Sequence, residues 1–152
     1  MFLYNCRFLS NSRWLWWLEK TDPRIDATNV SSINQNHNGH ILNIIRLTKY
    51  WNSYNNTYNI PSYLLETIIL NYYKYLEKKD NYWVDSEFRN LLNFLSKEIL
   101  FDVDDPKGIQ GNINSFSSIE RKQISQKAKL CFQKANDAIT LENSNQKASI
   151  NK

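Results

Sequence analysis

The sequence has 152 residues, 41% of them hydrophobic, and a formal net charge of +4. This length suits one domain that buries roughly 70% of its unfolded surface. No run of about 18 apolar residues occurs, which excludes a membrane-spanning helix, and no signal peptide is indicated, so we expect a cytoplasmic protein.

The positive charge is concentrated at the C-terminal end. Residues 121–152 contain seven Lys or Arg and two acidic residues, which leaves the first 120 residues slightly negative. A general nucleic-acid-binding surface would spread its basic side chains over one face of the fold, so this distribution argues against such a surface. A solvated helix face and a nucleic-acid contact confined to the last helix are both compatible with it.

The chain opens with an irregular segment, residues 1–25, which is rich in tryptophan and has no steady hydrophobic period. At most one short strand is expected there. A short helix is predicted next, with Asp26 as its N-cap and an end near Asn38, where Gly39 follows as a stop signal.

Two stronger amphipathic helices follow. The first runs from Gly39 to Tyr54, with an inward face at three-to-four spacing made of Ile41, Ile44, Ile45, Thr48 and Trp51. After an Asn/Tyr-rich loop at 52–59, Pro61 is placed for the first turn of the next helix, which runs to about Lys79. The buried stripe of this second helix is predicted to be Leu64, Leu65, Ile68, Ile69, Tyr72 and Leu76.

Asp85 is predicted to cap a third long helix, which ends before an acidic turn at 102–106. The run Ser117-Ser118-Ile119-Glu120 is a capping box that begins the last helix, which ends near Leu141. The polar tail, 142–152, is expected to be disordered. The sequence therefore predicts an all-α fold, an antiparallel bundle of four to five helices that spans 26–141.

Three segments in chain order carry the functional signal. They are Ile44-Ile45-Arg46-Leu47-Thr48-Lys49-Tyr50-Trp51-Asn52 near the end of one helix, Ile60-Pro61-Ser62-Tyr63-Leu64-Leu65-Glu66 at the start of the next, and Asp105-Pro106 followed by Gly111-Asn112. In order and spacing they resemble the C-terminal helical lobe of the bacterial cyclic-oligonucleotide synthase-like nucleotidyltransferases, in the superfamily of cyclic GMP-AMP synthase and oligoadenylate synthase. The segment from Trp17 to Arg24 also looks like the stretch that leads into this lobe.

The resemblance implies that Lys49 and Ser62 bind the triphosphate of ATP or GTP and that Tyr63 stacks on the base. Arg46, three residues before Lys49, is a further candidate for contact with the phosphates. The residue types suit these roles, because a helix N-terminus with a hydroxyl attracts phosphate, lysine is a mobile charge and a phenol ring stacks on any base. Other roles stay open on the sequence alone. Lys49 and Arg46 also suit a solvated surface or a salt bridge, Ser62 a helix cap, Tyr63 a core or surface position, and Glu66 the helix dipole.

The catalytic carboxylates of the family are not found. In the family, a Gly-Ser turn and an Asp/Glu-x-Asp pair on sheet strands hold the Mg²⁺ ions of nucleotidyl transfer, and this sequence has neither ahead of its helices. We therefore expect a truncated form that is inactive by itself, with no catalytic residues and no metal ligands. A missing catalytic half would expose Trp14, Trp16 and Trp17, so pairing with that half or self-association is expected.

The other chemistry-bearing residues are interpreted as structural. Cys6 and Cys131 lie far apart and outside any metal-ligand spacing. His37 and His40 lie in a polar turn without an acid and a nucleophile beside them. Asp105 before Pro106 is explained by a turn rather than by a cation site.

The leading hypothesis is a helical lobe that binds ATP or GTP for the synthesis of cyclic or linear oligonucleotide signals in antiviral defence. One alternative is a non-enzymatic helical interaction module. Another is a nucleic-acid-binding domain that uses the basic last helix.

Overall fold

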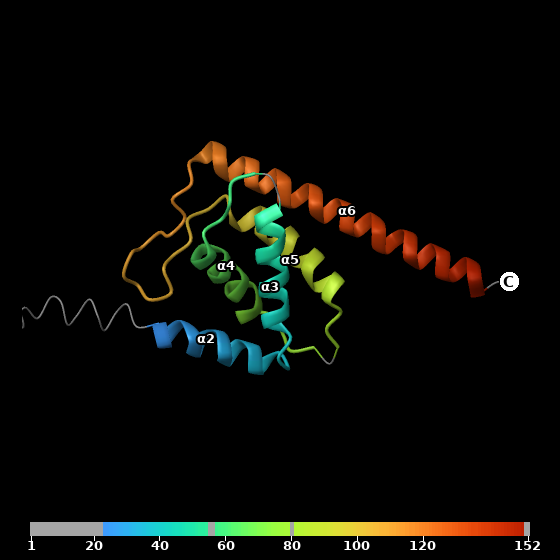
Figure 1. Ribbon diagram of the computed structural model, residues 1–152, viewed down its shortest axis with the longest axis horizontal. Coiled ribbons are helices and arrows are strands. Elements are labelled where there is room, and N and C mark those ends of the chain that lie inside the picture. Colours follow the sequence, from blue (N-terminus) through green and yellow to red (C-terminus); the bar gives the residue numbers. More distant parts are fainter. Residues whose placement is uncertain (1–22, 55–56, 80, 151–152) are drawn as a thin grey trace, which may run out of the picture.

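The computed structural model describes the backbone of residues 23–54, 57–79 and 81–150, with side chains described from residue 28 to residue 142 within these ranges. The described part contains five helices: α2 (Pro23–Asn36), α3 (Ile41–Tyr54), α4 (Ser62–Lys74), α5 (Val84–Glu98) and α6 (Ser118–Ile150). In Figure 1, α3, α4 and α5 form the centre, α2 lies along one side, and α6 packs on α5 and extends beyond the bundle.

The predicted all-α bundle is confirmed. Among the described residues there is no strand, only an isolated antiparallel bridge between Asp104 and Asn112. The short strand expected near the start of the chain, and most of the irregular segment 1–25, lie outside the described residues. No helix in the described part is long and apolar enough to cross a membrane.

The core is formed by the apolar stripes of α3, α4 and α5, with a smaller share from α6. Full burial of each large aliphatic side chain stabilises the fold by about 1.5–3 kcal/mol. Trp51, Tyr72 and Leu76 are half-buried and pack against the edge of this cluster. The fully buried side chains include Ile41, Ile44, Leu65, Ile68, Ile69, Leu91, Leu95 and Ile99.

The α2 helix begins at Pro23, three residues before the predicted N-cap, so the prediction for Asp26 is wrong. Proline favours the first helical turn because its fixed φ suits the helix and its missing N–H needs no partner there. The predicted stop is confirmed. Asn38 and Gly39 adopt left-handed backbone angles, with φ of 58° and 81°, and the Gly39 N–H donates to the carbonyl of Asn34 at 2.8 Å.

The α4 helix ends at Lys74 rather than near Lys79. If the helix continued, the carbonyl of Tyr73 would accept the N–H of residue 77. Instead it accepts the Leu76 N–H at 3.3 Å and the imidazole Nε2–H of His37 at 3.0 Å. The side chain of His37 therefore helps to stop the helix, a long-range effect that local propensity does not contain.

The N-cap of α5 is Trp83, and no side chain caps this helix, so the prediction that Asp85 is the cap is wrong. Asp85 lies in the first turn together with Glu87. A carboxylate in the first turn also complements the helix dipole. Asp85 therefore indicates correctly that a helix starts here, although it is not the N-cap residue.

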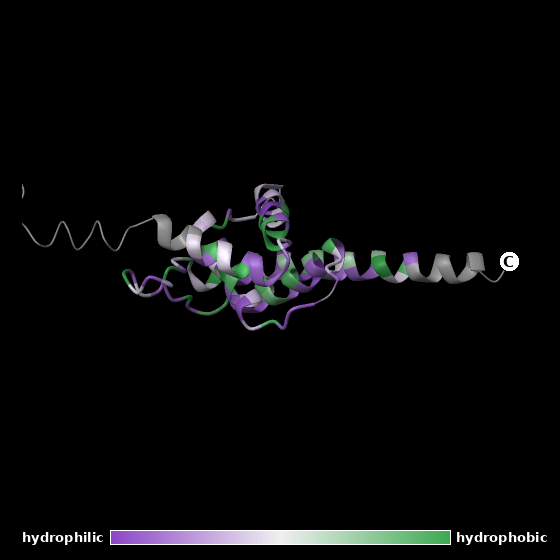
Figure 2. Cartoon of the chain, turned by 90° about the horizontal axis from the view of Figure 1, so that it is seen from below, coloured by the Kyte–Doolittle hydropathy of each residue, from purple (hydrophilic) through white to green (hydrophobic). Residues whose placement is uncertain are grey.

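The capping box of α6 is confirmed. The Glu120 carboxylate accepts the Ser117 N–H and hydroxyl at 2.8 Å each, and the Glu120 N–H donates to Ser117 Oγ at 3.4 Å. The helix then runs to Ile150, whereas the sequence indicates an end near Leu141 and a disordered tail. No Gly or Pro interrupts 121–150, and extending an existing helix is far easier than starting one. Figure 2 shows hydrophilic and hydrophobic residues alternating along the exposed length.

The side chain of Asn52 joins the last turn of α3 to the start of α4. Its amide nitrogen donates to the carbonyl of Ile60 at 2.8 Å and to Asn59 Oδ1 at 2.6 Å, and its oxygen accepts the Ile60 N–H at 3.0 Å. Asn52 and Ile60 are both buried. Because both backbone groups of Ile60 are held, the residues that open α4 are fixed in position beside the end of α3.

We predict that Asn52→Ala lowers the free energy of unfolding by about 2–3 kcal/mol, because it leaves the buried N–H and C=O of Ile60 without partners. Urea titration followed by circular dichroism measures this change. Asn43→Ala, on the exposed side of α3, is the matched control and should cost less than about 0.5 kcal/mol. Equal midpoints for the two variants would contradict the role of Asn52.

Candidate functional site

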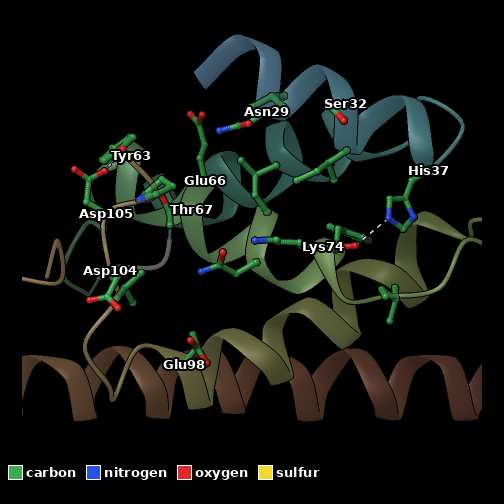
Figure 3. A pocket seen from close by; sticks show the side chains of 18 of the residues that line it. Asn29, Ser32, His37, Tyr63, Glu66, Thr67, Lys74, Glu98, Asp104 and Asp105 are labelled. Carbon is green, nitrogen blue, oxygen red and sulfur yellow. Dashed lines mark hydrogen bonds between the residues drawn. The ribbon is translucent and has the colours of Figure 1, made fainter. Parts of the chain in front are cut away.

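A cleft of about 1090 Å³ opens between α2, α4 and the loop that follows α5 (Figure 3). This volume is in the range of small-molecule sites in proteins. The polar lining includes Asn29 and Ser32 of α2, Ser62, Tyr63, Glu66, Thr67, Asn71 and Lys74 of α4, Glu98 of α5 and Asp102, Asp104 and Asp105 of the loop.

Two of the four predicted ligand residues, Ser62 and Tyr63, line this cleft. Ser62 is the first residue of α4 and is exposed. The N-cap is Pro61, with no side-chain hydrogen bond to the helix start, so Ser62 is not the capping residue. The first backbone N–H groups of a helix lack partners within the helix and attract anions.

Lys49 reaches the same place from α3. Its Nζ forms an ion pair with Glu66 Oε1, and both side chains are partly exposed, 41% for Lys49 and 29% for Glu66. Glu66 lies one turn after Ser62 on the same side of α4. The structure therefore brings the lysine to the beginning of α4, although Lys49 itself is not among the cleft-lining residues.

Arg46 lies one turn before Lys49 and is exposed. Its Nη1 donates to Asn43 Oδ1 at 3.3 Å, and it is not among the residues that line the cleft. Of the four predicted ligand residues, Arg46 is therefore the one that the structure brings least close to the site.

Tyr63 connects α4 to the acidic turn. Its hydroxyl donates to Asp105 Oδ1 at 2.6 Å, and Lys107 Nζ lies 5.8 Å from the centroid of its ring. The ring is half-buried and lines the cleft. The second and third sequence segments thus meet in space, through a phenol and a carboxylate that are 42 positions apart in the chain.

Asp105 organises the turn around it. Besides the Tyr63 hydroxyl, its carboxylate accepts the N–H groups of Lys107 at 3.0 Å, Ile109 at 3.0 Å and Gln110 at 3.1 Å. Burial raises the pKa of this carboxyl, but the bonds from Tyr63 and the three N–H groups together outweigh burial and hold the pKa below its ordinary value. Asp105 is therefore a carboxylate whose acceptor positions are already used within the protein.

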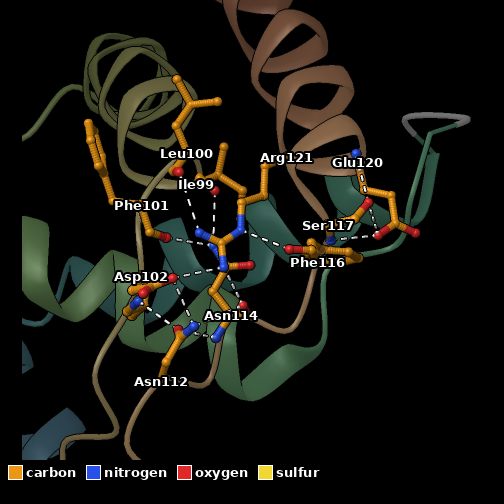
Figure 4. Close-up of polar contacts among 11 residues, drawn as sticks. Ile99, Leu100, Phe101, Asp102, Asn112, Asn114, Phe116, Ser117, Glu120 and Arg121 are labelled. Atoms are coloured by element: carbon orange, nitrogen blue, oxygen red, sulfur yellow. Dashed lines mark hydrogen bonds and ion pairs between the residues drawn. The ribbon is translucent and has the colours of Figure 1, made fainter.

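Arg121 of α6 holds the other end of this loop (Figure 4). Its guanidinium donates to the carbonyls of Phe116 at 2.9 Å and Asn114 at 2.6 Å, and to Asp102 Oδ1 at 2.9 Å. The buried Asn114 side chain in turn donates to the carbonyls of Ile99 at 2.9 Å and Phe101 at 2.8 Å. The acidic rim of the cleft is thus attached to both α5 and α6.

His37 lies in the predicted turn after α2, and its side chain is buried and structural. Its Nδ1 contacts the Tyr82 hydroxyl, and its Nε2 binds the carbonyl of Tyr73. The nearby carboxylate of Glu87 pairs with Lys79 and accepts the Tyr73 hydroxyl at 3.4 Å. Burial, with the charge of Glu87, raises the pKa of Tyr73 above its ordinary value. These residues stabilise the connection between α4 and α5.

Sequence reasoning missed several residues that shape the site. Asn52, Asn114 and Arg121 position it, and Glu66 touches the predicted lysine. Asn52 is the last residue of the first sequence segment, directly after Trp51. Because asparagine is abundant throughout the chain, its position there did not identify it as a structural residue. Among the described residues, no group of three His, Cys, Asp or Glu side chains lies close enough to hold a metal ion.

Asp105→Asn should be destabilising at pH 7 and should flatten the acid dependence of stability. Because the folded pKa of Asp105 lies below its unfolded value, its contribution is present above about pH 4 and is lost as the pH falls through the folded pKa. Urea midpoints at pH 7, 4 and 3 measure this, with exposed Asp104→Asn as the control. A difference between wild type and Asp105→Asn that does not shrink at low pH would count against it.

Arg121→Ala should lower the free energy of unfolding by about 2–3 kcal/mol, because its charge-assisted bonds to the partly buried carbonyls of Phe116 and Asn114 have no replacement. Lys122→Ala, at the neighbouring exposed position, should cost less than about 0.5 kcal/mol. Thermal unfolding compares the two variants. Similar melting temperatures would show that the loop does not depend on the guanidinium.

No family model matches the chain. Over 126 residues it is 38% identical to a protein of Bacillus cereus (strain VD146) named a probable cyclic nucleotide synthase. The match covers 82% of this chain and 37% of that relative, so the chain spans little more than a third of the length of the relative it matches. The resemblance indicated by the three sequence segments is supported, because over the matched residues the chain is similar to this probable cyclic nucleotide synthase.

Proposed function

We propose that the cleft binds ATP or GTP and that the chain acts as the helical lobe of a nucleotidyltransferase that makes cyclic or linear oligonucleotide signals. The observation that carries the proposal is the contact between Lys49 and Glu66, which brings the lysine beside the turn of α4 that holds Ser62 and Tyr63. The similarity to a probable cyclic nucleotide synthase supports the substrate class.

The phosphates would bind where α3 and α4 meet. A nucleoside triphosphate carries about four negative charges, and such a group is favoured at a helix N-terminus with a hydroxyl beside it. Ser62 supplies the hydroxyl at the first position of α4, and Lys49 supplies a compact charge that can move by rotation of its side chain. Arg46, one turn away on α3, would add a second, more distant charge.

The base would stack on Tyr63. The ring already has a fixed position, because its hydroxyl is bound to Asp105, and Asp105 is fixed by three backbone N–H groups. Stacking of a base on an aromatic side chain contributes about 1–3 kcal/mol and tolerates different bases. A ring held in place beforehand loses little freedom on binding, which favours this use of Tyr63.

The described residues do not fit the Mg²⁺ ions that the complete family enzyme uses. Two carboxylates of the cleft lie next to the proposed nucleotide ligands, and both already have partners. Glu66 is paired with Lys49, and Asp105 accepts hydrogen bonds from the Tyr63 hydroxyl and from backbone N–H groups. We propose that the chain binds nucleotide but forms no phosphodiester bond by itself. Pairing with a catalytic half, or with a second copy, through Trp14, Trp16 and Trp17 is also proposed; these residues lie outside the described part.

The setting that we propose is the cytoplasm, in signalling for antiviral defence, since that is the use implied by the family resemblance. A competing function is nucleic-acid binding by α6. Lys122, Lys129 and Lys134 are exposed on this helix, which extends beyond the bundle. This alternative depends on charge alone, whereas the cleft combines charge, a hydroxyl, an aromatic ring and a defined volume.

Lys49→Ala and Tyr63→Ala should each weaken the binding of ATP or GTP by about five- to twentyfold, which isothermal titration calorimetry measures. The matched control, Lys129→Ala, should leave nucleotide affinity unchanged. The competing function predicts a different pair of results. Replacement of Lys127, Lys129 and Lys134 would weaken binding to a nucleic-acid oligomer and reduce its salt dependence, and neither cleft variant would change nucleotide affinity.

A further inference from the structure

Glu66 is a negative charge placed where the proposed site needs a positive one. Its carboxylate lines the cleft in the second turn of α4, with Ser62 one turn before it and Tyr63 three residues before it. It is also the partner of Lys49, the cation that would meet the phosphates. In the free protein the site's own lysine is therefore neutralised by the site's own carboxylate.

We propose that Glu66 is an internal competitor of the nucleotide phosphates, so that the Lys49–Glu66 pair acts as a latch that must open for tight binding. This inference rests on the proposed function. Two attractions act on a phosphate at this place, the charge of Lys49 and the positive end of the α4 dipole. Glu66 uses the first of them in the absence of ligand, because it contacts Lys49, whereas its place in the second turn of α4 leaves the N-terminal N–H groups to the phosphate.

The burial of the pair suits a latch. The Glu66 side chain is 29% exposed and that of Lys49 41%, so the pair is neither fully solvated nor locked in the core. A partly exposed pair is worth little and can exchange partners, whereas a fully buried pair would be expensive to break. The lysine can leave Glu66 for a phosphate by rotation about its side-chain bonds, without movement of α3 or α4.

The latch also discriminates between ligands. A group with one negative charge gains little by replacing a carboxylate that is already in place. A triphosphate brings several charges and can attract Lys49 away while the α4 N-terminus holds another of its oxygens. The pair therefore favours nucleoside triphosphates over monophosphates, and Glu66 is a specificity-determining residue of the proposed site.

The test measures ATP affinity by isothermal titration calorimetry for wild type and Glu66→Gln. The variant should bind ATP about three- to tenfold more tightly, because Lys49 is released from its carboxylate partner. The matched control is Glu98→Gln, which removes a cleft carboxylate on α5 that does not contact Lys49, and it should change affinity by less than about twofold. Inorganic tripolyphosphate should respond to Glu66→Gln as ATP does, since the latch acts on the phosphates.

A double variant separates the latch from a general charge effect. In a Lys49→Gln background, Glu66→Gln should change ATP affinity no more than Glu98→Gln does. Weaker binding by Glu66→Gln would show that Glu66 instead holds Lys49 in place for the ligand, and it would overturn the latch, as would an unchanged affinity. If neither wild type nor Glu66→Gln binds ATP, the proposed function itself fails, whereas binding by wild type that ignores Glu66→Gln refutes the latch alone.

Discussion

The site depends on one constraint, the pair of hydrogen bonds between the Asn52 side chain and the backbone of Ile60. Lys49 and Ser62 are on different helices, joined by a loop whose described residues, 57–61, form no helix or strand. Such a loop could leave α4 in many positions, and ordering each of its residues costs about 1–2 kcal/mol. Asn52 satisfies both backbone groups of Ile60 inside the core and so selects one position. As a consequence, Glu66 and Lys49 meet, and Ser62 lines the cleft one turn before Glu66.

The second part of the site is built outward from the acidic turn. Asp105 collects its own backbone N–H groups and the Tyr63 hydroxyl, so the turn and the start of α4 are held together by one carboxylate. Arg121 then fixes the loop to α6 through carbonyls and Asp102. The carboxylate of Asp105 and the guanidinium of Arg121 both form their hydrogen bonds with other groups of the protein. Asp102 and Asp105 of the rim thus act as structural anchors, whereas Lys49 of α3 is paired with the partly exposed Glu66.

Much of the fold follows from local sequence. The three-to-four spacing in α3 and α4 predicted the core stripes, and the Ser117–Glu120 capping box and the Asn38–Gly39 stop are confirmed because each depends on residues within one turn. One error arose where a distant group decides, because the end of α4 depends on His37. The other errors are local: the predicted caps of α2 and α5 lie inside these helices, and α6 passes Leu141 because nothing in its sequence stops it. For the site, the three segments identified Ser62 and Tyr63 as candidate ligands, and both line the cleft. The pairing of Lys49 with Glu66 could not be predicted, because it depends on how α3 packs against α4.

The central claim is that the end of α3 and the start of α4 form one anion site. The most direct measurement is a titration with ATP followed by the backbone amide signals in nuclear magnetic resonance spectra. The account predicts saturable shifts at Lys49, Ser62 and Tyr63, with the signals of Lys129 and Lys134 on α6 unchanged. Shifts confined to α6, or no saturable change at the start of α4, would contradict it.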